Sequence, residues 1–220
     1  MPQIRSEDTS TAEVLRDGRY HHSALLADPE AAHLAPPIKQ RLDALVKARA
    51  ETEGADALRQ EKQALRDRAE YLHDDLHRAC ELEVLGQVKK NRAATAYRQT
   101  YRQGLSGLIA LSGEEQEREV KEMVKGLDES FPELAKKYKK DLLKRAADAA
   151  AAARALAEAE TGSAHAFAAE VLCRGELARQ MRRNEGALLS LFPDDKALVR
   201  LYFRNRRRPA KDDEPAPDPT

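Results

Sequence analysis

The chain has no tryptophan, and aromatic residues make up only 5% of its 220 residues. A core without large rings must be built from Leu, Ala and Val, so we expect helices to approach closely along Ala-rich seams. The two cysteines, Cys80 and Cys173, are too few for a disulfide framework and favour a reducing compartment. No run approaches the roughly 18 apolar residues that a membrane span needs, and no secretory signal begins the chain. These absences predict a soluble, cytoplasmic protein.

Net charge is also lacking, because 38 Lys and Arg residues balance 38 Asp and Glu residues. This neutrality argues against a dedicated electrostatic nucleic-acid binder. Charged residues still make up 35% of the chain, and apolar residues recur between them at steps of three and four. That pattern is typical of long amphipathic helices, and the region 38–203 never alternates as a strand would. The sequence therefore predicts an all-α fold.

Helix-capping residues, glycines, prolines and changes of composition divide the chain into three parts. Residues 1–35 are expected to form a flexible arm with short helices, one of which begins after Ser10 and stops at Gly18. Residues 36–205 form the predicted helical domain. Residues 206–220, rich in Pro and acidic residues, are expected to be disordered. A weak similarity between segments 36–127 and 132–205 leaves an internal duplication open.

The helical domain is predicted to contain two long helical units, roughly 38–111 and 132–192, packed antiparallel. An acidic helix over 114–127 connects them, and a short helix over 194–204 covers one end. Whether Gly54, Gly86 and Gly162 are kinks or hairpin turns decides between an elongated helical hairpin and a four-helix bundle. The first unit carries a coiled-coil-like apolar stripe, which consists of Leu58, Leu65, Ala69, Leu72 and Leu76.

Few residues are candidates for catalysis or metal binding. Glu70, His73 and His77 share one helical face at a spacing that can hold a metal ion. Carboxylate-bridged bundles, however, use two Glu-x-x-His units and two further Glu, and the chain has one unit. Cys80 follows His77 by three residues, but no strand–turn–helix or glycine-rich loop accompanies it. We therefore assign no catalytic residue, metal or cofactor, and predict that the chain is not an enzyme.

Basic residues gather in two blocks, one of lysines near residue 140 and one of arginines before the acidic tail. The candidates for partner binding are Lys136, Lys137, Lys140, Arg204, Arg206, Arg207 and Arg208. An Arg cluster at a helix C-terminus is favoured by the helix dipole alone. It can also bind phosphate, nucleic acid or an acidic protein surface.

Three hypotheses of function follow, of which the first is preferred. It is a non-enzymatic helical interaction or scaffold protein that binds a protein partner or forms a homodimer, because narrow Ala-rich stripes leave apolar surface uncovered. The second is a nucleic-acid-associated protein that uses the C-terminal Arg cluster. The third is a metal-binding bundle centred on Glu70, His73 and His77.

Overall fold

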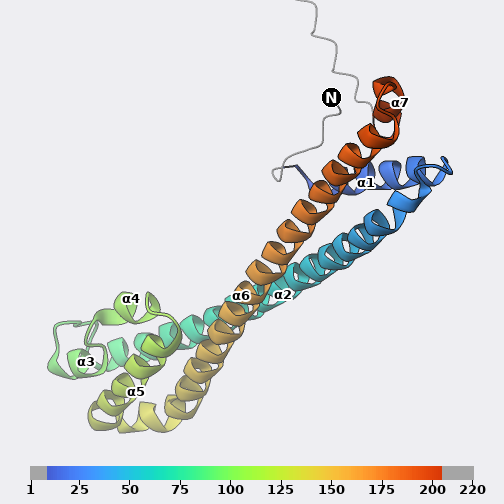
Figure 1. The fold of residues 1–220 in the computed structure, drawn as a ribbon. Helices are drawn as coiled ribbons and strands as arrows, with labels where there is room; N and C mark the ends of the chain where they lie inside the picture. Colours follow the sequence, from blue (N-terminus) through green and yellow to red (C-terminus); the bar gives the residue numbers. More distant parts are fainter. Residues whose placement is uncertain (1–8, 205–220) are drawn as a thin grey trace, which may run out of the picture. The chain divides into compact units, whose positions relative to one another are not determined.

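The computed structural model describes residues 9–204, and every regular element in this range is a helix (Figure 1). The predicted all-α class is confirmed. Two helices are long, α2 (Ala35–Gln87) and α6 (Pro132–Leu191). The other elements are α1 (Thr11–Leu26), the 3-10 helix η1 (Ala32–Leu34), α3 (Thr95–Thr100), α4 (Gly104–Ile109), α5 (Gly113–Ser130) and α7 (Lys196–Leu201). None of these described helices is both long and apolar enough to cross a membrane.

The chain forms two compact units. Unit 2 is the continuous segment Gly54–Ala164, whereas unit 1 combines the residues before it with those after it. Both long helices contribute residues to each unit, because α2 includes Glu53 and Gly54 and α6 includes Ala164 and His165.

The core of unit 1 is formed by α1, the first part of α2, the second part of α6, and the residues around α7. Its buried members include Leu25, Ile38, Leu45, Leu177 and Leu188. Here α2 and α6 run in opposite directions, since the η1 residue Leu34 contacts Asn184 while Arg41 pairs with Glu176.

Helix α1 differs from the loosely held arm that the sequence suggested. It begins after Ser10 as predicted but continues through Gly18 to Leu26. A Cβ at Gly18 would lie 2.9 Å from the side-chain tips of Leu42 and Leu177. The glycine therefore allows α1 to pack closely against this core and does not end the helix.

Unit 2 packs α3, α4 and α5 around the end of α2 and the start of α6 (Figure 1). Ion pairs and hydrogen bonds show that α6 runs opposite to both of its long neighbours here. The contacts with α2 are Ser163–Asp56 at 2.6 Å and Lys137–Glu83 at 2.5 Å, and those with α5 are Lys139–Asp128 at 2.6 Å and Arg154–Glu114 at 3.5 Å.

The predicted first unit, roughly 38–111, is not one continuous helix. Helix α2 ends at Gln87, and Lys89 and Lys90 follow in the left-handed region with φ of 52° and 61°. Two short helices then replace the expected continuation. Gly54 and Gly162 lie inside α2 and α6 and are therefore not hairpin turns, whereas Gly86 lies next to the last residue of α2.

The internal duplication stays a prediction, and the expected disorder of 206–220 concerns residues outside the described range.

Candidate functional site

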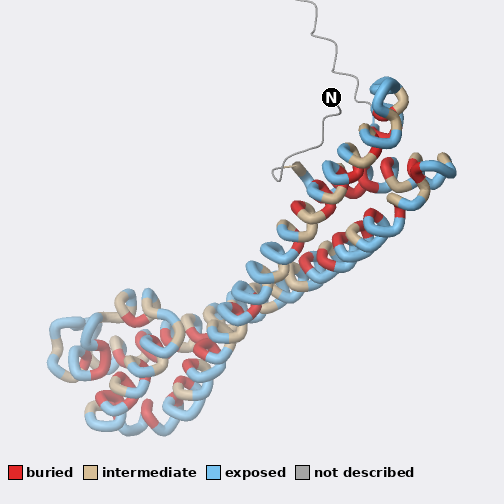
Figure 2. Tube along the Cα trace, viewed as in Figure 1, coloured by how far each residue is buried: buried red, intermediate tan, exposed pale blue. Residues whose placement is uncertain are grey.

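Residues 54–72 of α2, which lie in unit 2, are poorly covered by the rest of the protein, and we call them the bare stretch. From Gly54 to Leu72 no residue of α2 is buried (Figure 2). Leu58 is 46% exposed and Leu65 is 50% exposed. Both belong to the predicted coiled-coil-like apolar stripe of α2. The first half of that stripe is therefore surface.

The neighbouring helices explain this exposure. Opposite Leu58, α6 presents Ala159 and Gly162, which are too small to cover a leucine. Helix α5, which could add a third layer, begins where Glu114 pairs with Arg154. The α2–α6 register places Arg154 near the level of Leu65, so α5 starts at about the point where the bare stretch reaches that leucine.

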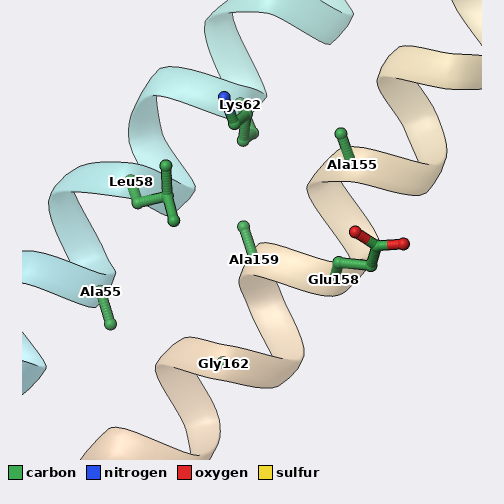
Figure 3. A pocket seen from close by; sticks show the side chains of 7 residues that line it. All are labelled: Ala55, Leu58, Lys62, Ala155, Glu158, Ala159 and Gly162. Atoms are coloured by element: carbon green, nitrogen blue, oxygen red, sulfur yellow. The ribbon is translucent and has the colours of Figure 1, made fainter.

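A groove of about 240 Å³ runs between the two helices at this level (Figure 3). Leu58 and Ala159 point toward each other across it, and Lys62 and Glu158 place opposite charges at its edges. We call the groove, together with Leu65, which lies two helical turns beyond Leu58 on the same side of α2, the two-helix face. Its members are Ala55, Leu58, Lys62, Leu65, Ala155, Glu158, Ala159 and Gly162. An apolar groove with a charged edge is the kind of surface on which an amphipathic helix packs.

The predicted metal candidates include two fully buried histidines. His73 and His77 are both 0% exposed, and their ring centroids lie 4.4 Å apart. His73 Nε2 and both ring nitrogens of His77 have no hydrogen-bond partner. Burial lowers the pKa of His77 to about 3, and burial also lowers the pKa of His73. Both imidazoles are therefore neutral at pH 7.

The third candidate, Glu70, does not complete a metal site with this pair. Its carboxylate pairs with Arg66 at 3.2 Å. Within residues 9–204, no three His, Cys, Asp or Glu side chains gather in a group that could hold a metal ion. The two histidines alone offer too few donors for the coordination typical of structural zinc.

Cys80 is completely buried on α2, one turn beyond His77. Burial raises the pKa of its thiol to about 11. A nucleophilic cysteine needs a thiolate and is commonly activated by a neighbouring imidazolium. The opposite shifts at Cys80 and His77 favour the uncharged form of each, so this pair lacks the activation that nucleophilic catalysis requires.

Most of the described basic residues that were predicted to bind a partner form ion pairs within the chain. Three lysines of the first block pair with carboxylates: Lys136 with Glu133, Lys137 with Glu83, and Lys139 with Asp128. Lys140 is exposed. Arg204 lies 3.6 Å from Asp17, and the predicted candidates Arg206, Arg207 and Arg208 lie outside the described residues.

Sequence reasoning missed a buried polar network in unit 1. The Asn184 amide donates to His21 Nε2 at 3.2 Å, and His21 Nδ1 donates to the Tyr202 carbonyl at 2.9 Å. The ring also stacks on Phe203, with centroids 4.5 Å apart. Burial lowers the pKa of His21 to about 4, which suits this neutral tautomer. No spacing rule could reveal contacts between residues so distant in the chain.

Comparisons with protein-family models, curated protein sequences and solved structures found no match.

Proposed function

We propose that the chain is a non-enzymatic helical scaffold that binds protein through the two-helix face. The observation that carries this proposal is the exposure of Leu58 and Leu65, one heptad apart, beside a groove lined by small residues. Side chains at this spacing on one helix form the seam of a helix–helix contact.

The energetics fit a binding surface. Burying the exposed halves of Leu58 and Leu65 would contribute about 1 kcal/mol each. Charges at the edge of the groove, Lys62 and Glu158, would set the register of a partner rather than its affinity.

Photocrosslinking in the cells that make the protein tests the proposal. A benzoyl-phenylalanine at Leu65 should give a discrete protein adduct whose components mass spectrometry identifies. The same group at Ala57, an exposed position on the same bare stretch, is the control and should give less of that adduct. A background smear that is equal at both positions would contradict the proposal.

Nucleic-acid association through the Arg cluster has weaker support. Arg204, the member of this cluster that the structure describes, lies 3.6 Å from Asp17, which favours its use within the chain. Removing residues 204–220 should therefore leave retention on immobilised nucleic acid unchanged. A steep, salt-dependent loss of retention after the truncation would restore this second candidate.

A further inference from the structure

We infer that the partner of the two-helix face is a second copy of this chain, related by a two-fold axis that crosses α2 between Glu61 and Lys62. This inference rests on the proposed function, because it names the occupant of the same face. The argument comes from the sequence of the bare stretch and from the area that it can bury.

The eight residues 58–65 read Leu-Arg-Gln-Glu-Lys-Gln-Ala-Leu. A two-fold axis at their centre places Leu58 of one copy opposite Leu65 of the other. It also places Gln60 opposite Gln63, and Glu61 opposite Lys62. The two-fold axis repeats each pairing, so two Glu–Lys pairs and two leucine pairs form. An isologous interface requires this self-complementarity, in which the same patch meets itself.

The charges are well placed for this role. Glu61 and Lys62 form an ion pair within the chain at 3.0 Å, and Glu61 is 61% exposed there. A second copy would bring the opposite charge to each of them and produce an alternating four-charge cluster at the axis. The leucines would then lie on either side of this cluster, and each would extend over its partner's small-residue groove.

The area predicts a weak dimer. Residues 54–72 of α2 span about 28 Å at 1.5 Å per residue, and a face two helices wide is about 20 Å across. Two such faces bury about 1,100 Å² in total, which is close to the lower limit for specific complexes. The association should therefore be weak and should depend on protein concentration.

Charge substitutions at residues 61 and 62, on either side of the proposed axis, test the inference. The dimer dissociation constant of the full chain is measured by sedimentation over a concentration series. In the native background, Glu61→Lys places lysines opposite lysines and should raise the dimer dissociation constant about fivefold. In a Lys62→Glu background, the same Glu61→Lys change restores opposite pairs and should lower that constant about fivefold.

Within each comparison only residue 61 changes, so any effect of Lys62→Glu on Glu158 is common to both proteins and cancels. Circular dichroism of each variant at low concentration checks that the monomer is folded. If Glu61→Lys shifts the constant in the same direction in both backgrounds, the proposed axis is wrong. A native chain that stays monomeric up to about 1 mM is also incompatible with self-association.

Disulfide trapping locates the register independently. Leu58→Cys and Leu65→Cys chains, each also carrying Cys173→Ser, should crosslink when mixed. Either variant alone should crosslink poorly, because identical positions lie about 10 Å apart along the helix axis. Equal crosslinking in the mixture and in the single-variant solutions would overturn the two-fold arrangement.

Failure of the inference and failure of the proposed function give different results. A monomeric native chain whose Leu65 photocrosslinks to a different protein loses the inference but keeps the proposed function. Absence of any specific adduct at Leu65 removes both.

Discussion

At the scale of single residues, three buried histidines, His21, His73 and His77, have environments that sequence patterns do not reveal. His73 and His77 are buried and neutral, and three of their four ring nitrogens have no partner. Buried polar atoms without partners destabilise the folded state by roughly 1–3 kcal/mol each. His21 does not carry this cost, because Asn184 and the Tyr202 carbonyl form hydrogen bonds with its two ring nitrogens.

Acid should therefore destabilise the fold through these imidazoles. The pKa of His77 falls from 6.5 to about 3 on burial, so between these values the unfolded chain binds a proton that the folded chain does not. The contribution of neutral His77 to the free energy of unfolding is fully present above pH 6.5 and is lost as the pH falls toward 3. The slope is on the order of 1 kcal/mol per pH unit for one such group.

His77→Leu tests this linkage. The variant should match or exceed the native stability at pH 7 and should lose stability less steeply from pH 6.5 to 4.5, as followed by urea unfolding. His165→Leu, at an exposed position of α6, is the control and should keep the native slope. A native slope in the His77 variant would show that this histidine titrates normally in the folded state.

At the scale of helices, local signals predicted where elements begin better than where they end. The predicted starts at residues 114, 132 and 194 lie within two residues of the observed starts of α5, α6 and α7. The sequence left open whether the chain turns near Gly86, because Lys89 and Lys90 adopt left-handed backbone conformations that sequence patterns assign to glycine or asparagine.

The candidate site was only half predictable for a related reason. The heptad stripe through Leu58 and Leu65 was visible in the sequence, but which of its members the fold leaves exposed was not. Burial depends on what lies opposite, and here α6 offers Ala155 and Ala159 while α5 begins too late to cover the leucines. Such a surface is a tertiary property that no local pattern encodes.

Two helical glycines should respond oppositely to the same substitution. A Cβ at Gly126 would lie 2.3 Å from the backbone oxygen of Gln99, so Gly126→Ala should destabilise by about 1–3 kcal/mol. No atom approaches within 4 Å of a Cβ at Gly54, so Gly54→Ala should stabilise by about 0.5–1 kcal/mol. Urea unfolding of both variants measures the difference. Equal stabilisation would show that α3 does not press against α5 at Gly126.

At the scale of the whole molecule, stability is unevenly distributed along α2. Its first part buries Ile38, Leu42 and Leu45, whereas residues 54–72 bury none of their side chains. Segments with few buried contacts open locally at lower free-energy cost. The backbone of α2 is thus one continuous helix, but residues 54–72 should open locally at a lower free-energy cost than residues 38–48.

Hydrogen exchange should reveal this difference and its dependence on association. In dilute solution, amides of 54–72 should exchange faster than those of 38–48. Raising the protein concentration should slow exchange in 54–72 while the 38–48 segment, which serves as the internal reference, stays unchanged. Uniform protection along α2 at every concentration would contradict both the bare stretch and its proposed covering.

Because residues 54–164 form unit 2 and the residues before and after them form unit 1, the two units become complete in a fixed order during synthesis. Leu42 and Leu45 share a core with Leu177 and Leu188, so that core cannot close until unit 2 has been translated between them. At about 5–20 residues per second, the interval is roughly 6–20 s. Throughout it, the nascent first segment presents its apolar face to the cell while the inserted unit can already fold. Ribosome pausing within 54–164 would therefore lengthen the exposure of residues that precede the pause, and chaperone occupancy on stalled chains should map to the first 53 residues.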